Sequence, residues 1–391
     1  TKQVAIDESQ LERLDVFFSD GDSFVLGMDN TNVQRNVSMT TEGGGIELSL
    51  SGNTFVGGSV KLRATDGSSQ FRMSQTASLR RSLRQWTRGG QDSATTLSDQ
   101  VTVGGAASVR NLEGVSDVQI RDEAQVKRFV GSGFTVQRRV TYVNRDGRLL
   151  KADIYTPKSE GPHPAVVAVH GGGWVSGNQA KMSAEARELA QRGYVVMSIN
   201  YRLAPTNRFP AQVHDVKAAI QFIKAHAAEF DVDANHVGLW GYSAGAHLAL
   251  LAGLTDAADG LEDPDAPVGS PNSLVQAVVA AAPPTDFRDV DLDSNEFRFL
   301  FGGTRREVPE LYEQASPAHW VSGWDPPVYM YIGENDNLVS GDKAAQLADD
   351  MEAVGVDAEL YTVPKKNHLT AKRDRTAIYQ SLRFLDMQLK V

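Results

Sequence analysis

Short stretches of alternating apolar and polar residues fill the first part of the chain. Between Asp15 and about Arg110, pieces such as GIELSLSG and FVGGSVKLRA are separated by Gly, Ser, Thr and Asn. Period-two alternation broken by turn residues is typical of strands that bury one face. We therefore expect an antiparallel β-sandwich or barrel here, with no convincing internal repeat. The arginine-rich stretch ASLRRSLRQW (77–86) is predicted as a short helix.

The pattern changes after Gln137. VTYVNRDGRLLKADIYTP reads as a β-hairpin that turns at residues 145–147, and continuous apolar runs then alternate with segments of helical period. Strands are predicted at 165–170, 194–200, 236–240, 274–282, 327–333 and 358–363, and helices at 180–193, 209–230, 243–254, 343–355 and 375–389. This alternation is typical of a mostly parallel sheet covered by helices on both faces. We place the boundary between Arg110 and Gln137 and divide the chain into a β-rich accessory domain, residues 1–115, and an α/β domain, residues 116–391.

Composition narrows the classes of function. The 391 residues are 41% hydrophobic and 23% charged, as in a folded globular protein. A formal net charge of −10 without a Lys/Arg block argues against a nucleic-acid partner, and no apolar run is long enough to span a bilayer. The chain has no cysteine, which excludes disulfides and thiolate catalysis. It begins at Thr1 rather than Met, so we expect a processed N-terminus and a secreted or periplasmic location rather than a cytoplasmic one.

GYSAG, residues 241–245, follows directly after the predicted strand HVGLW and precedes a helix. A serine between a strand and a helix, with small residues two positions away on each side, is typical of a nucleophile elbow. The tight turn presents the serine oxygen at the carboxyl edge of the sheet. The sequence therefore predicts Ser243 as a nucleophile.

A nucleophilic serine needs a base and an acid that orients the base. In this arrangement both partners follow the serine, in the order acid and then histidine. His368 comes directly after the strand AELYTV, whereas His319 precedes every suitable acid and is expected to be structural. The loop GENDNLV (333–339) offers Asp336 as the acid, with Glu334 as the alternative.

Three consecutive glycines after the strand AVVAV suggest how the reaction is stabilised. HGGGW, residues 170–174, leaves backbone N–H groups unobstructed by a Cβ atom, and such groups stabilise an oxyanion. We expect the N–H groups of Gly172, Gly173 and Ala244 to form an oxyanion hole. Trp174 and Tyr242 are expected to contact substrate, with Trp174 limiting the acyl pocket to short groups.

These motifs resemble the α/β-hydrolase superfamily, and within it esterases with HGGGW, YRLAP, GYSAG, a GExDxxV acid loop and a late Asn-His pair. The resemblance covers Phe134 to Val391 and implies an α/β-hydrolase fold for the second domain. Hormone-sensitive-lipase-like members usually have Asp where this chain has Tyr242, which favours the bacterial feruloyl/acetyl-esterase-like or kynurenine-formamidase-like side. Family members often have Gly shortly before the catalytic His, where this chain has Lys365 and Lys366.

The resemblance implies a serine carboxylesterase that acts on short-acyl or aromatic esters, including esters linked to carbohydrate. An amidase or peptidase on the same scaffold and a non-catalytic ligand-binding protein are the alternatives. We expect no cofactor and no metal, since no HExxH or carboxylate cluster with ligand spacing appears. The segment 286–312 is expected as a lid or substrate wall, in which Phe297, Phe299, Leu300 and Phe301 either line the alcohol side or anchor the loop. For residues 1–115 we expect either glycan binding or a role in homo-oligomer formation and pocket shape.

Overall fold

The computed structural model describes residues 2–7, 9–18, 24–42, 45–65, 68–80, 83–88, 93–97, 102–111, 116–120, 125–130 and 133–390. The chain divides into two compact units. The first comprises Thr1–Thr135, Pro157–Glu160 and Glu188–Gly193, and the second comprises Val136–Thr156, Gly161–Arg187 and Tyr194–Val391.

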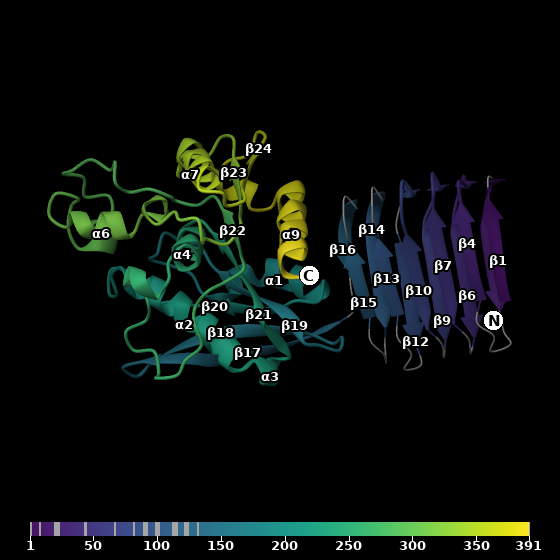
Figure 1. The fold of residues 1–391 in the computed structure, drawn as a ribbon, viewed down its shortest axis with the longest axis horizontal. Helices are drawn as coiled ribbons and strands as arrows, with labels where there is room; N and C mark the ends of the chain where they lie inside the picture. The colour runs from purple at the N-terminus through teal and green to yellow at the C-terminus, as the bar shows by residue number, and fades with distance from the viewer. Residues whose placement is uncertain are drawn as a thin grey trace. The chain divides into compact units, whose positions relative to one another are not determined.

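The described part of the first unit consists of short strands (Figure 1). They are β1 (Lys2–Asp7), β2 (Gln10–Leu11), β3 (Leu14–Phe18), β4 (Phe24–Asp29), β5 (Asn32–Val33), β6 (Val37–Glu42), β7 (Ile46–Ser51), β8 (Phe55–Val56), β9 (Val60–Thr65), β10 (Ser69–Met73), β11 (Ser78–Leu79), β12 (Leu83–Arg88), β13 (Ser93–Leu97), β14 (Thr102–Asn111), β15 (Ser116–Ile120) and β16 (Gln125–Val130).

From β1 to β11, each described strand pairs in parallel with the strand three places later, as in β1-β4-β7-β10-β13 and β3-β6-β9-β12. Phe24 is in register with Ile46, and Ile46 with Ser69, so successive turns of the chain are 22 and 23 residues apart. Three strands per turn, stacked in parallel, make this unit a parallel β-helix.

The interior of the β-helix is formed by stacked apolar side chains. Leu26, Leu48 and Phe71 are in register on β4, β7 and β10, and all three are buried. At one corner the Thr54 hydroxyl accepts a hydrogen bond from the Thr31 N–H and donates one to the Met28 carbonyl. This hydroxyl therefore links the backbone of Thr31 to that of Met28.

The all-β character of this region was predicted correctly, but its topology was not. An antiparallel sandwich was expected, whereas the described strand pairs are parallel. Alternation of apolar and polar residues indicates only that one face of a strand is buried. This is true of strands in an antiparallel sandwich and of strands in a parallel β-helix. The predicted helix at 77–86 is also wrong, because Ser78–Leu79 and Leu83–Arg88 are strands. The sheets continue past residue 115, since β15 pairs with β13 and β16 with β14.

The second unit is built on one eight-stranded sheet of order β17-β18-β20-β19-β21-β22-β23-β24. The strands are β17 (Phe134–Arg145), β18 (Arg148–Pro157), β19 (His163–Val169), β20 (Val195–Ile199), β21 (Val232–Tyr242), β22 (Ala277–Ala281), β23 (Val328–Gly333) and β24 (Ala358–Val363). β18 and β20 are antiparallel, and all neighbours from β20 to β24 are parallel. The predicted hairpin turn is present, with positive φ at Asp146 and Gly147.

The helices of this unit follow the predicted alternation. They are α1 (Ser183–Gln191), α2 (Ala211–Ala225), α3 (Ala227–Phe230), α4 (Ala244–Gly253), α5 (Arg298–Phe301), α6 (Pro309–Gln314), α7 (Gly341–Ala353), α8 (His368–Ala371) and α9 (Arg375–Leu389), with 3₁₀ turns η1 (Gln179–Met182), η2 (Ala257–Asp259) and η3 (Pro317–His319). Leu239 belongs to the core shared with α2 and α4, whereas Gly238 faces Leu385 and Leu389 of α9. Helices therefore cover both faces of the sheet, as in an α/β-hydrolase fold.

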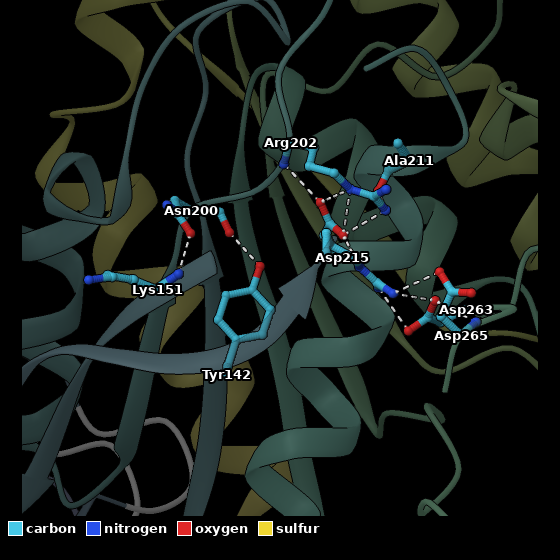
Figure 2. A network of polar contacts seen from close by, with 9 residues as sticks. Tyr142, Lys151, Asn200, Arg202, Ala211, Asp215, Asp263 and Asp265 are labelled. Carbon is cyan, nitrogen blue, oxygen red and sulfur yellow. Dashed lines mark hydrogen bonds and ion pairs between the residues drawn. The ribbon is translucent and has the colours of Figure 1, made fainter. Parts of the chain in front are cut away.

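A buried ionic network lies beneath the segment that follows β20. The carboxylate of Asp215, on α2, accepts hydrogen bonds from Arg145 and from both the backbone and side chain of Arg202. Arg145 also binds Asp263 through two nitrogens, at 2.8 and 2.9 Å. Figure 2 shows Asp215 facing Arg202, with Asp263 and Asp265 beyond it. The network fixes the position of residues 201–205, which in turn support the functional site.

No helix among the described residues is both long and apolar enough to cross a bilayer. Because β19, β21, β23 and β24 are parallel, the loops that follow them meet at one edge of the sheet. The predicted site residues lie in these loops.

Candidate active site

Ser243 occupies a strained turn between β21 and α4. Its backbone has φ 54° and ψ −122°, a conformation that residues other than glycine rarely adopt. The flanking glycines are required by close backbone approach: a Cβ atom on Gly241 would lie 2.2 Å from the Gly245 carbonyl oxygen, and one on Gly245 would lie 2.2 Å from that of Val169. The turn thus has the geometry that the GYSAG pattern predicts.

The side chains of Ser243, His368 and Asp336 form one hydrogen-bonded series. His368 Nε2 lies 2.9 Å from Ser243 Oγ, and His368 Nδ1 lies 2.7 Å from Asp336 Oδ2. The other carboxylate oxygen of Asp336 accepts hydrogen bonds from the N–H groups of Leu338 and Val339. A proton on Nδ1 of the imidazole satisfies both contacts, which leaves Nε2 to accept the serine proton.

Glu334 and His319, the other acid and the other histidine considered from the sequence, form contacts with other residues. Glu334 accepts a hydrogen bond from the backbone N–H of Lys365 at 2.7 Å, so it ties the acid loop to the histidine loop. His319 lies 3.4 Å from Glu313 and packs edge-on against Trp320. Asp336 is therefore the acid that contacts the imidazole, and Lys365 has a backbone role in this loop.

The glycine loop after β19 lies against the serine. A Cβ atom on Gly171 would be 3.1 Å from that of Ser243, and one on Gly172 would collide with the Ser176 carbonyl at 2.0 Å. Gly172 has φ 133°, which favours glycine strongly. Among the described residues, none accepts a hydrogen bond from the backbone N–H of Gly172, Gly173 or Ala244. These donors remain available for an oxygen atom of a ligand.

The YRLAP segment holds this loop in place, a role that the sequence did not reveal. The Tyr201 hydroxyl donates to the His170 carbonyl at 2.9 Å, and the two rings stack with centroids 4.3 Å apart. The Ala204 N–H donates to the Trp174 carbonyl at 2.9 Å. Burial lowers the pKa of His170 from 6.5 to about 4, so its ring stays neutral at physiological pH.

The Trp174 side chain is held in place by His247, a residue to which the sequence analysis gave no role. Its indole N–H donates to Nδ1 of His247 at 3.1 Å, and Nε2 of His247 contacts the Ala315 carbonyl at 2.7 Å. Burial lowers the pKa of His247 to about 4, which keeps the ring neutral. The only signal in the sequence is a histidine in an otherwise apolar helix.

A cleft of about 1070 Å³ opens over Ser243 and His368. Its apolar lining includes Trp174, Phe287, Val290, Phe297, Leu338 and Val339. Its polar lining includes Lys181, Ser183, Glu185, Asp286, Glu296, Lys343, Lys372 and Arg373. Tyr242 also lines the cleft, and its contact with substrate stays a prediction.

The first part of the segment 286–312 lines the cleft, through Asp286, Phe287, Val290, Glu296 and Phe297. Phe297 lines the cleft and packs edge-on against Trp174, with ring centroids 6.2 Å apart. Leu300 and Phe301 are buried in the core instead, and Phe299 packs against that core. The anchoring role therefore applies to three of these four residues, and wall formation to Phe297.

Within the described part of the chain, no group of three or more His, Asp or Glu side chains has an arrangement that could hold a metal ion.

Comparison with known proteins identifies the family. The BD-FAE family matches residues 152–351. Esterase LipC of Mycobacterium tuberculosis is 34% identical over 227 residues, which are 56% of this chain and 55% of LipC. Isoprenylcysteine alpha-carbonyl methylesterase of Arabidopsis thaliana is 29% identical over 247 residues, 60% of this chain and 57% of that protein. The chain thus spans about half the length of the curated relatives it matches.

Solved structures agree with this result. A truncated carbohydrate esterase from gut microbiota superposes with a TM-score of 0.60 at 27% identity, covering 66% of this chain and 97% of that one. The propionate-bound esterase 2 of Thermogutta terrifontis has a TM-score of 0.55 at 26% identity, covering 65% and 93%. These matches confirm the resemblance drawn from the motifs. The chain belongs to the BD-FAE family, a family of α/β-hydrolase esterases.

Proposed function

We propose that this protein is a serine carboxylesterase in which Ser243, His368 and Asp336 form a catalytic triad. The observation that supports the proposal most strongly is the hydrogen-bonded series from Ser243 Oγ through His368 to Asp336 beside unpaired backbone N–H groups. A serine in a strained backbone conformation is by itself compatible with a purely structural turn. An imidazole within proton-transfer distance of its hydroxyl favours a catalytic role, because it can act as the base that activates the serine.

In the proposed mechanism, Ser243 Oγ attacks the ester carbonyl while His368 Nε2 takes the hydroxyl proton. The carbonyl π electrons move to oxygen, and the N–H groups of Gly172, Gly173 and Ala244 stabilise that charge. When the carbon–oxygen bond of the alcohol breaks, His368 returns the proton to the leaving oxygen and an acyl-enzyme remains. Water then attacks the acyl carbonyl and gives one proton to His368. When the bond between the acyl carbon and Ser243 Oγ breaks, His368 returns that proton to Oγ, which releases the acid and restores the serine.

The aromatic wall supports a preference for short acyl groups. Trp174 follows the oxyanion glycines, and its ring is held edge-on against His247, Phe287 and Phe297. A ring restrained on several sides cannot rotate away to admit a long chain. The propionate and butyrate complexes of the Thermogutta terrifontis esterase 2 support a short acyl group here as well.

The test is hydrolysis of p-nitrophenyl acetate beside p-nitroacetanilide, which share the acetyl group and differ in the bond cleaved. We expect turnover of the ester, a much slower reaction of the anilide, and a loss of about 10⁶ in kcat in Ser243→Ala. Faster cleavage of the anilide would favour an amidase. Absence of turnover of both substrates by the unmodified protein would favour a non-catalytic role.

The roles proposed for the β-helical unit remain predictions. Retention of the full chain on insoluble polysaccharide would support glycan binding, whereas a dimer mass by light scattering without retention would support oligomer formation.

A further inference from the structure

Ser243 and His368 follow strands that are not neighbours in the sheet. Ser243 comes after β21 and His368 comes after β24, with β22 and β23 between them. Neighbouring strands lie about 4.8 Å apart, so the ends of these two strands are separated by about 14 Å. The distance of 2.9 Å between Ser243 Oγ and His368 Nε2 therefore depends on how the histidine loop, residues 364–368, is held.

The backbone of the histidine loop is bonded to the acid loop, residues 334–339. The Lys365 N–H donates to the Glu334 carboxylate at 2.7 Å. The Asn335 N–H donates to the Lys366 carbonyl at 2.8 Å. These bonds fix the imidazole relative to the acid of the triad, which belongs to the same acid loop. They do not reach the serine, so they do not by themselves set the distance between the imidazole and the serine oxygen.

Tyr242 joins the nucleophile turn to the histidine loop. Its hydroxyl donates to the backbone carbonyl of His368 at 2.9 Å, and the two ring centroids are 5.4 Å apart. Among the described residues, two hydrogen bonds connect 241–245 with 364–369, namely this bond and the one between Ser243 Oγ and His368 Nε2. The bond between the serine and the imidazole changes whenever a proton moves, so the tyrosine supplies the connection that is independent of the reaction.

The tyrosine side chain is itself restrained. Lys372 Nζ lies 4.9 Å from the centroid of the Tyr242 ring, and a cation over an aromatic face is attracted to it. The same ammonium group lies 3.4 Å from the Glu185 carboxylate and donates to the Lys181 carbonyl at 3.1 Å. Burial, together with the nearby charge of Asp336, raises the pKa of Tyr242 to about 12. The hydroxyl therefore keeps its proton at neutral pH and remains a donor.

We infer that Tyr242 is a positioning residue for the proposed esterase reaction: the hydrogen bond from its hydroxyl to the His368 carbonyl holds the imidazole at proton-transfer distance from Ser243. Tyr242 acts through the histidine, which is a different role from the substrate contact expected from the sequence. The inference rests on the proposed function, because the imidazole has to be placed accurately only if it transfers a proton. Even a small displacement of a catalytic group lowers the rate strongly.

Tyr242→Phe tests this inference, because it removes the hydroxyl and keeps the ring. We expect kcat on p-nitrophenyl acetate to fall about tenfold, with KM within about twofold of wild type, since acylation and deacylation both use His368 and slow together. The matched control is Tyr329→Phe, which removes a hydroxyl that donates to Gln380 Oε1 at 2.7 Å on a residue that does not line the cleft. This control is expected to keep the wild-type kcat.

A wild-type kcat in Tyr242→Phe would overturn the positioning role, and so would an equal fall in Tyr329→Phe. A raised KM with a wild-type kcat would also overturn it and would favour a contact between the hydroxyl and substrate. If Tyr242→Phe does not fold, Lys372→Met, which removes the cation over the ring, must lower kcat about threefold. A wild-type kcat in Lys372→Met would then reject the inference.

The unmodified protein separates the two proposals. If it does not hydrolyse p-nitrophenyl acetate, the esterase function fails. Turnover by the unmodified protein with an unchanged kcat in Tyr242→Phe rejects the positioning role alone.

Discussion

The indole N–H of Trp174 donates a hydrogen bond to Nδ1 of His247 across 3.1 Å, and both side chains are buried. Nε2 of the same imidazole contacts the Ala315 carbonyl, so one ring joins the glycine loop, α4 and the end of α6. The wall of the proposed acyl pocket is therefore held by a hydrogen bond from behind as well as by ring packing.

Removing either partner of this bond should loosen the acyl wall. We expect Trp174→Phe and His247→Leu each to raise the ratio of kcat/KM for p-nitrophenyl hexanoate to that for the acetate by about tenfold. The double variant should show little more than either single variant, because both remove the same interaction. Phe230→Leu, at a buried ring outside the cleft, serves as the control. Additive effects in the double variant would contradict the coupling.

The acid of the triad should be Asp336 and not Glu334. Asp336→Asn keeps the side-chain size but places a donor beside the imidazole, which favours the wrong tautomer, and kcat on p-nitrophenyl acetate should fall about 10⁴-fold. Glu334→Gln retains an oxygen that can accept from the Lys365 N–H, so its kcat should stay within a few-fold of wild type. Steady-state measurement of kcat for both variants checks this assignment. A larger fall in Glu334→Gln than in Asp336→Asn would identify Glu334 as the acid instead.

Stability should fall as the solution becomes acidic, through His247 and His170. Burial lowers the pKa of each imidazole from 6.5 to about 4. The unfolded chain then binds more protons than the folded one between these values, so the free energy of unfolding decreases as pH falls from about 6.5 to about 4. A shift of this size corresponds to about 3 kcal/mol for each ring. Urea denaturation at pH 7.5, 5.5 and 4.5 measures the slope, which should be shallower in His247→Leu than in wild type.

The buried network around Arg145 should matter more for stability than an exposed ion pair of equal length. Arg145→Met leaves the carboxylate of Asp263 without its bidentate partner and removes one of the two guanidinium groups that contact Asp215, and removing one member of a buried pair costs about 3–5 kcal/mol. Arg306 forms a 2.7 Å pair with Asp293 at the surface, with both side chains largely exposed, so Arg306→Met should leave the urea midpoint near wild type. Equal midpoints for the two variants would show that the network contributes little.

Much of the α/β unit could be predicted from the sequence because its signals are local. Each buried parallel strand is a continuous apolar run, and GYSAG, HGGGW, Asp336 and His368 directly follow such strands. Parallel strands bring the loops that follow them to one edge, so the meeting of Ser243, His368 and Asp336 follows from topology.

The remaining features depend on contacts between distant segments. The β-helix repeats in the position of its strands rather than in residue identity, so Leu26, Leu48 and Phe71 stack without a recognisable motif. Likewise Glu185 reads as an ordinary first-turn carboxylate of α1, and only folding places it against Lys372 beside the cleft.

The most direct test of the central claim is covalent labelling with a fluorophosphonate, followed by peptide mass spectrometry. We expect one adduct per chain, located on Ser243, with no adduct in Ser243→Ala and much slower labelling in His368→Ala. An adduct on another residue, or undiminished labelling of Ser243→Ala, would contradict it.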